Sequence, residues 1–334
     1  MAERFKAPVL KTGDGQPSVS SNLTASAIIA SDRHVFRFLM VIPPALVRTV
    51  VALMASLSGT GAGATDLSGL WDFGQPAASE ARFRAALVGA SPDNAVILAT
   101  QIARTHGLRG DFAQARALLQ ALDASLATAG TEARAWHALE TGRTYASATH
   151  PRRTQTPASR AEARRWFERA AVLAGEARAD AVAVDACHML AFVEPAPADR
   201  LNWTLRALAI AEASEQPPAR RWRASLHNNA GMALHDLGRL DDALTHFQRQ
   251  VALRQEAGNV AAGRVARWMV AWTLRGLGRA DDALAMQLEL ERELDQAGET
   301  DVHVYEELAT LYRERGDPAR ADHYAGLRAK HQAR

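Results

Sequence analysis

Residues 237–244 read LGRLDDAL and residues 277–284 read LGRADDAL, so almost the same eight residues recur after 40 positions. A third copy, RGDPARA, occupies residues 315–321, and an earlier copy, RGDFAQA, occupies residues 109–115. Recurrence at a nearly constant spacing is typical of repeat architectures, in which one supersecondary unit is used several times. The four segments therefore predict that most of the chain is built from one repeated unit.

Each copy has the chemistry of a tight turn between two helices. The glycine, such as Gly238, ends the first helix because a residue without Cβ adopts the left-handed conformation at no steric cost. An alanine five residues later, such as Ala243, lets the two helices approach closely. Asp241 and Asp242, repeated as Asp281 and Asp282, are expected to cap the second helix or to favour its positive end, rather than to act as an acid–base pair.

Residues 224–257 resemble the tetratricopeptide repeat, with Gly231, Leu234, Gly238, Ala243 and Phe247 at that family's characteristic positions. Weaker copies cover 135–174, which carries an insertion, and 178–213, which lacks the turn glycine. The resemblance spans residues 93–330, about 70% of the chain. It implies an all-α, right-handed superhelical solenoid of antiparallel helix pairs, with about six hairpins and an N-terminal capping helix near residues 76–89.

The N-terminal part differs from the repeats. Residues 1–65 are expected to be disordered or a mis-annotated extension, 66–92 a capping-helix region, and 93–334 the repeat domain. Residues 1–27 resemble a translated serine tRNA gene, which favours a gene model that starts too early. A segment from Met40 weakly resembles a secretion signal. Cytoplasmic location is expected if translation begins near residue 66, and export if that signal functions.

Composition excludes several classes of protein. The sparse strand-favouring residues argue against a β-sandwich or barrel, and the single cysteine, Cys187, excludes a disulfide framework. Residues 1–65 carry six basic and three acidic side chains, whereas the remainder carries 33 basic and 34 acidic ones, so no overall field attracts nucleic acid. No uninterrupted apolar run is long enough to span a membrane, and no membrane partner is expected.

No sequence motif supports catalysis. The chain lacks HExxH, GxSxG and GxxxxGK[ST], and its eleven histidines form no metal-ligand spacing with carboxylates or cysteine. Cys187, placed among apolar residues in a predicted helix, is expected to be a buried small hydrophobe. We therefore predict no enzyme activity, no catalytic residue, no metal site and no cofactor. A capping box at Ser159 and Glu162 is expected to start the helix after the insertion.

The family resemblance implies that the first helix of each pair lines a concave groove, which binds a protein or peptide partner. Two alternatives stay open at this point: the tryptophans pack between repeats, or the arginines form intramolecular ion pairs. A second functional hypothesis is a regulatory protein whose solenoid changes shape when a peptide or small ligand binds. The family's lysine-based clamp for C-terminal carboxylates is not reproduced, and the sequence indicates neither partner, pathway nor oligomeric state. The candidate groove residues are Arg104, Arg143, Asn228, Asn229, His235, Trp268, Trp272, Arg275 and Arg313.

Overall fold

The computed structural model describes residues 67–332, and this part of the chain contains helices and turns but no strand. The expectations for residues 1–65, including the tRNA-like and signal-like segments, lie outside the described residues. The proposed domain boundaries at 65 and 92 stay predictions. In the described residues, no helix is both long and apolar enough to cross a bilayer.

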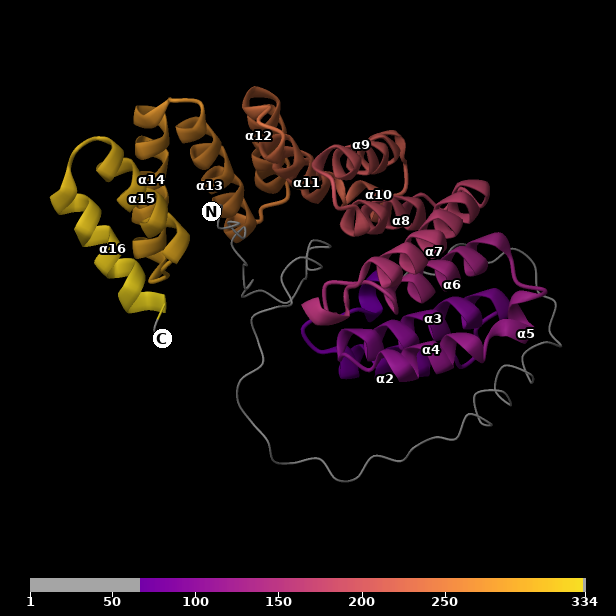
Figure 1. The fold of residues 1–334 in the computed structure, drawn as a ribbon. Coiled ribbons are helices and arrows are strands. Elements are labelled where there is room, and N and C mark those ends of the chain that lie inside the picture. Colours follow the sequence, from indigo (N-terminus) through magenta and orange to yellow (C-terminus); the bar gives the residue numbers. More distant parts are fainter. Residues whose placement is uncertain (1–66, 333–334) are drawn as a thin grey trace. The chain divides into compact units, whose positions relative to one another are not determined.

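The described chain divides into two compact units. The C-terminal unit comprises 196–201 and 223–332, and the N-terminal unit comprises 67–195 and 202–222. In the C-terminal unit, each helix packs against the next one along the chain (Figure 1). Its helices are α11 (Arg223–Asp236), α12 (Leu240–Glu256), α13 (Val260–Gly276), α14 (Ala280–Ala297), α15 (Val302–Glu314) and α16 (Pro318–Gln332).

The N-terminal unit begins with a short 3-10 turn, η2 (Ser68–Leu70), and the predicted first helix, which covers 76–86. A second 3-10 turn, η3 (Arg152–Thr154), lies in the insertion. The helix α9 is divided, since its first residues belong to the C-terminal unit. The α-helices are α2 (Pro76–Ala86), α3 (Pro92–Leu108), α4 (Phe112–Gln120), α5 (Asp123–Leu126), α6 (Thr131–Arg143), α7 (Pro157–Glu176), α8 (Asp180–Val193), α9 (Pro197–Ala213) and α10 (Pro217–Arg220).

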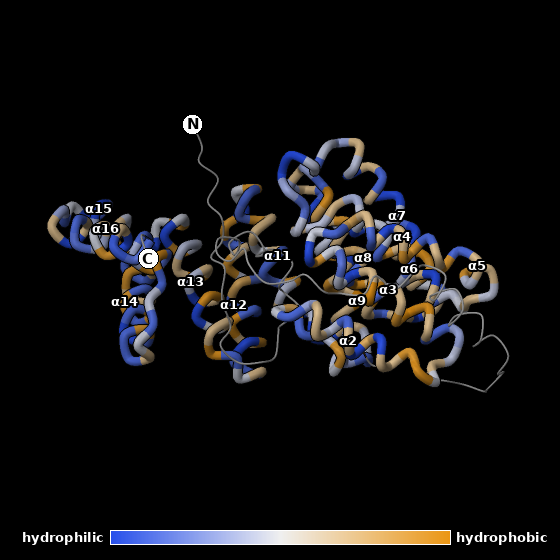
Figure 2. The backbone as a smooth tube through the Cα atoms, turned by 90° about the horizontal axis from the view of Figure 1, so that it is seen from below, coloured by the Kyte–Doolittle hydropathy of each residue, from blue (hydrophilic) through white to orange (hydrophobic). Residues whose placement is uncertain are grey.

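The predicted all-α architecture of consecutive helix pairs is confirmed. The pairs α3–α4, α6–α7, α8–α9, α11–α12, α13–α14 and α15–α16 correspond to the six predicted hairpins, and α2 precedes them. The tube coloured by hydropathy shows hydrophobic and hydrophilic stretches alternating along α12 and α14, as amphipathic helices require (Figure 2).

In two helix pairs, the helices approach closely where a glycine of one helix meets a phenylalanine ring of the other. A Cβ added to Gly231 of α11 would lie 2.5 Å from the ring of Phe247 of α12. A Cβ on Gly142 of α6 would lie equally close, 2.5 Å, to Phe167 of α7. Both phenylalanines are fully buried. Glycine is therefore needed at these two positions because the aromatic ring occupies the space of a side chain.

One prediction about helix starts is wrong, and another is right in part. Helix α7 begins at Pro157 with Thr156 as its cap, whose hydroxyl accepts from the backbone N–H of Ser159, and Glu162 instead pairs with Arg165. The helix is thus capped by Thr156, three residues before Ser159, and the expected capping box does not form. Asp241 and Asp242 do not cap α12, but they lie in its first turn and so favour its positive end, as Asp281 and Asp282 do in α14. Arg239 and Arg279 precede these helices and pair with Asp242 and Asp282 at 2.7 Å.

Candidate functional site

Two groups of predicted residues lie in different units, and each group is described separately. In the C-terminal unit, four aromatic and imidazole rings follow one another across α11, α13 and α15. The rings of His235 and Trp272 stack with centroids 3.5 Å apart, and those of Trp272 and Trp268 stack at 5.9 Å. The ring of Trp268 meets that of His303 edge-on at 6.1 Å. We call His235, Trp272, Trp268 and His303 the aromatic row.

Exposure varies along the aromatic row. Trp268 is 8% exposed and belongs to the core of the C-terminal unit, whereas Trp272 is partly buried and packs against that core. His235 is also partly buried, and burial lowers its pKa, so the ring is neutral at physiological pH. The aromatic row therefore offers apolar ring surface at His235 and Trp272. The buried Trp268 stacks on Trp272 and connects it to the core.

The other predicted residues of this unit lie on the same three helices as the aromatic row. Asn228 and Asn229 are partly buried on α11, and the Asn228 amide donates to the Asn229 side chain at 3.3 Å. Arg275 holds Glu307 of α15 through two hydrogen bonds of 2.8 and 3.0 Å, so an intramolecular carboxylate already occupies its planar fork. Arg313 is exposed on α15.

In the N-terminal unit, Arg104 and Arg143 lie together with Glu140 and Asp185, which the sequence did not single out. Arg143 donates to Glu140 at 2.6 Å and also to Asp185. Arg104 lies farther from the same two carboxylates, with N–O distances of 3.6 and 3.9 Å. These four residues, which we call the ionic cluster, come from α3, α6 and α8. Each side chain is at most 10% exposed.

Burial and mutual attraction act against each other on these charges. Burial would lower the pKa of Arg143, but Asp185 and Glu140 outweigh it and raise that pKa. Burial would raise the pKa of Asp185, but Arg143 and Arg104 outweigh it and lower that pKa. For Glu140, burial prevails over both arginines and raises the pKa. The nearby His188 has its pKa lowered by burial to about 4, so it adds no charge at neutral pH.

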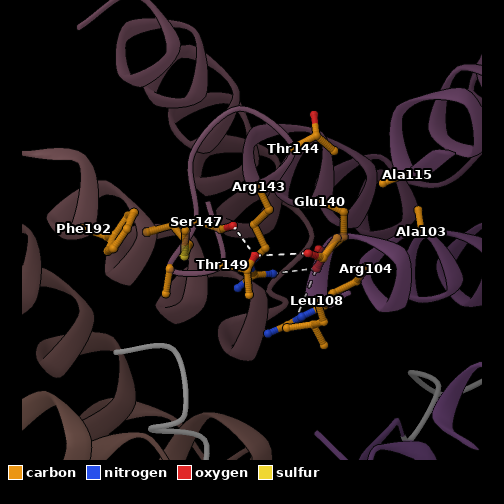
Figure 3. Close-up of a pocket in the computed structure, with 13 residues that line it drawn as sticks. Ala103, Arg104, Leu108, Ala115, Glu140, Arg143, Thr144, Ser147, Thr149 and Phe192 are labelled. Atoms are coloured by element: carbon orange, nitrogen blue, oxygen red, sulfur yellow. Dashed lines mark hydrogen bonds and ion pairs between the residues drawn. The ribbon is translucent and has the colours of Figure 1, made fainter. Parts of the chain in front are cut away.

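The ionic cluster borders a pocket that is partly open to solvent. Arg104, Glu140 and Arg143 line it, and Figure 3 shows these three side chains converging. Hydroxyl groups are contributed by Thr144, Ser147 and Thr149, all from the end of α6 or the segment after it. Ala103, Leu108, Ala115, Met189 and Phe192 supply the apolar lining.

Sequence analysis missed Glu140 and Asp185 as site residues. The pair Glu140 and Arg143, three positions apart on one helix, was a local signal for an ion pair. Asp185 lies 42 residues from Arg143 and had no such local signal. Cys187 is buried, and burial raises the pKa of its thiol to about 11, which agrees with the predicted packing role. In the described residues, no three His, Cys, Asp or Glu side chains group to hold a metal.

Comparison with known proteins identifies the repeat. Residues 222–292 match the family model of the tetratricopeptide repeat, whereas none of the curated proteins matches the chain. The kinesin-light-chain-type TPR-like repeats of Podosopora anserina are 16% identical, with a TM-score of 0.46 over 60% of this chain and 94% of that one. Aspartyl phosphate phosphatase F from Bacillus subtilis is 14% identical, with a TM-score of 0.48 over 76% and 74%.

The TPR domain of P58(IPK) is 15% identical, with a TM-score of 0.21 over 86% of this chain and 84% of that one. The matched residues include the Gly231–Phe247 contact and both copies of the LGR-x-DDAL segment. Residues 222–292 of the chain are therefore identified as tetratricopeptide repeats.

Proposed function

We propose that the chain is a non-catalytic scaffold that binds an extended segment of a partner protein along α11, α13 and α15 of the C-terminal unit. The tetratricopeptide fold is suited to protein interaction, because stacked helix pairs present an extended surface of side chains from successive first helices. The aromatic row carries this proposal. It places partly exposed rings on two of these helices, His235 on α11 and Trp272 on α13.

The chemistry of this surface favours a peptide with apolar side chains and free backbone groups. Flat aromatic rings bury a large apolar area at low entropic cost and are frequent among residues that dominate binding energy. Asn228 and Asn229 supply amide donors and acceptors for a peptide backbone. Arg275 is paired with Glu307, so it links α13 to α15 and offers no free charge to a peptide. Arg313 is exposed and available for an acidic side chain of the peptide.

A peptide display library panned against the full-length chain tests the proposal. We expect selected peptides to bind with Kd values in the micromolar range, which corresponds to about −8 kcal/mol. Trp272→Ala should weaken binding at least tenfold, since it removes the exposed ring while Trp268 remains in the core. Gln248→Ala, at an exposed position on α12, is the matched control and should leave the Kd unchanged.

Failure to enrich any peptide would contradict the proposal. So would peptides whose affinity is the same for the wild-type chain and for Trp272→Ala, because the aromatic row would then lie outside the binding surface. Circular dichroism of each variant confirms that the helices are retained, so that a loss of binding is not a loss of folding.

A further inference from the structure

We propose that the pocket of the N-terminal unit binds an aliphatic α-amino acid, with Arg104 pairing its carboxylate and Glu140 its ammonium group. This site is separate from the peptide-binding surface proposed above, and it involves a small molecule rather than a protein. It also gives a concrete form to the hypothesis of a ligand-sensing regulator. The argument rests on the unequal hydrogen bonding of the two arginines in the ionic cluster.

Arg143 is satisfied by the protein itself. Its two terminal nitrogens donate to Glu140 and Asp185, and its side chain is 8% exposed. Arg104 is almost as deeply buried, at 10% exposed, yet its contacts with the same carboxylates are 3.6 and 3.9 Å. Those distances are too long for hydrogen bonds. Among the described residues, none accepts a hydrogen bond from the Arg104 guanidinium.

The guanidinium of Arg104 is held in place by aromatic rings. Its central carbon lies 5.2 Å from the ring centroid of Trp71 and 5.3 Å from that of Phe73. These two rings stack on each other at 4.6 Å, and the Trp71 indole donates to Gln101 at 3.3 Å. A largely buried cation held against two rings, with no hydrogen-bond acceptor among the described residues, is prepared for a planar carboxylate that binds through two hydrogen bonds.

Glu140 supplies the complementary group. Its Oε1 accepts from Arg143, whereas its Oε2 is buried and has no hydrogen-bond partner among the described residues. A buried carboxylate oxygen without a partner is unfavourable. The terminal torsion of a glutamate is soft, so a small rotation of the carboxyl group can direct this oxygen to a ligand in the pocket. An ammonium group there satisfies the oxygen.

The overall charge also favours a zwitterion. The ionic cluster contains two arginines and two carboxylates, and His188 is neutral, so the cluster has no net charge before a ligand binds. A simple anion would leave an excess charge in this buried site, whereas an amino acid brings one charge of each sign. Beyond the charges, Leu108, Met189 and Phe192 offer an apolar wall for an aliphatic side chain.

The competing polar groups of the pocket are already engaged. The Thr149 hydroxyl donates to the backbone carbonyl of Gly107 at 3.1 Å, and the Ser147 hydroxyl lies 2.8 Å from His150 Nδ1. Figure 3 shows Ser147 and Thr149 on the same side of the pocket as Arg143. Arg104 and Glu140 are therefore the groups that define the polar end of the ligand.

Isothermal titration of the full-length chain with leucine, isoleucine, valine and methionine tests the proposal. We expect at least one of them to bind and to raise Tm. The two matched analogues of leucine, 4-methylpentanoate without the amine and 3-methylbutylamine without the carboxylate, should bind at least tenfold more weakly than leucine. Arg104→Gln should weaken binding at least tenfold.

Two further variants separate loss of binding from loss of folding. Ala148→Phe fills the pocket at a partly buried lining position without touching a charge, and it should also abolish binding. Arg109→Gln is the matched control, because Arg109 follows α3 but pairs with Glu80 outside the pocket lining, at 2.5 Å. The proposal is overturned if none of the four amino acids binds at 10 mM, about the weakest affinity of interest. It is also overturned if either leucine analogue binds as tightly as leucine, or if Arg104→Gln and Ala148→Phe leave binding unchanged.

Discussion

The connections between helices distinguish the two units. In the C-terminal unit, every connection from α11 to α16 contains a glycine with positive φ, namely Gly238, Gly258, Gly278, Gly298 and Gly316. In the N-terminal unit, Gly89 and Gly110 serve in this way after α2 and α3, but the α7–α8 turn uses Arg178 at φ 52°, and a long segment with the short η3 turn joins α6 to α7. Uniform short turns hold successive helices at one spacing, and longer connections relax that constraint.

The pocket lies at the irregular connection between α6 and α7. The residues after α6 contribute Thr144, Ser147, Ala148 and Thr149 to the pocket lining. The pocket thus lies where the repeat is interrupted. In the C-terminal unit, where the repeat is regular, alanine, leucine and aromatic side chains form one continuous core. The regular repeats thus carry the surface that we propose binds a peptide, and the interrupted repeat carries the pocket that we propose binds an amino acid.

The largest expected effect comes from a substitution that breaks the ionic cluster. Arg143→Met leaves Glu140 and Asp185 buried with only the more distant Arg104, so the free energy of unfolding of the N-terminal unit should fall by about 3–5 kcal/mol. Arg275→Met in the C-terminal unit removes a similar pair from a more exposed side chain, and we expect a loss of about 1–3 kcal/mol.

Hydrogen exchange followed by mass spectrometry, which reports protection in each unit separately, is the measurement. Arg239→Met, which removes an exposed ion pair, should change the free energy of unfolding by less than about 1 kcal/mol. Equal effects of Arg143→Met and Arg275→Met would remove the energetic distinction between the two units.

The next largest effect concerns a feature that the two units share, a glycine packed against a buried phenylalanine ring. Gly142→Ala and Gly231→Ala each place a Cβ 2.5 Å from a buried phenylalanine ring. We expect each to cost about 1–2 kcal/mol, since overpacking outweighs the better helix propensity of alanine. Gly263→Ala in α13 is the control, because its Cβ would meet nothing within 4 Å, and it should stabilise by up to about 1 kcal/mol. Urea denaturation gives the three values, and a stabilising Gly231→Ala would refute the close-contact explanation.

Sequence reasoning succeeded where the determining contacts recur locally. Gly231, Gly238, Ala243 and Phe247 lie within one hairpin, so their spacing alone predicts the turn and the close approach of the helices. The capping box at Ser159 failed because the same short pattern occurs by chance inside α7. Pro157 at the first helical position was the better signal for its start.

The ionic cluster shows the limit of that reasoning. Arg104, Glu140 and Asp185 belong to three helices, and a charged residue on a helix is normally solvated, so each one taken alone indicates a surface position. Their burial follows only from the packing of α3, α6 and α8. The alternative that the arginines form intramolecular ion pairs describes Arg104 and Arg143, because the carboxylates that they meet in the structure are those of the protein itself.

The smallest expected effect concerns the turn that distinguishes the units. Arg178 adopts the left-handed conformation at the α7–α8 turn, which costs a residue with a Cβ about 1–2 kcal/mol. Arg178→Gly removes that strain but adds chain entropy to the unfolded state, so we expect a net stabilisation of about 0.5–1 kcal/mol. The converse change, Gly278→Ala at φ 77°, should destabilise the C-terminal unit by about 1 kcal/mol. Calorimetric Tm values measure both changes. A lower Tm for Arg178→Gly would mean that the Arg178 side chain stabilises the turn by more than its backbone strain costs, and the irregular turn would then be a favourable feature of the N-terminal unit.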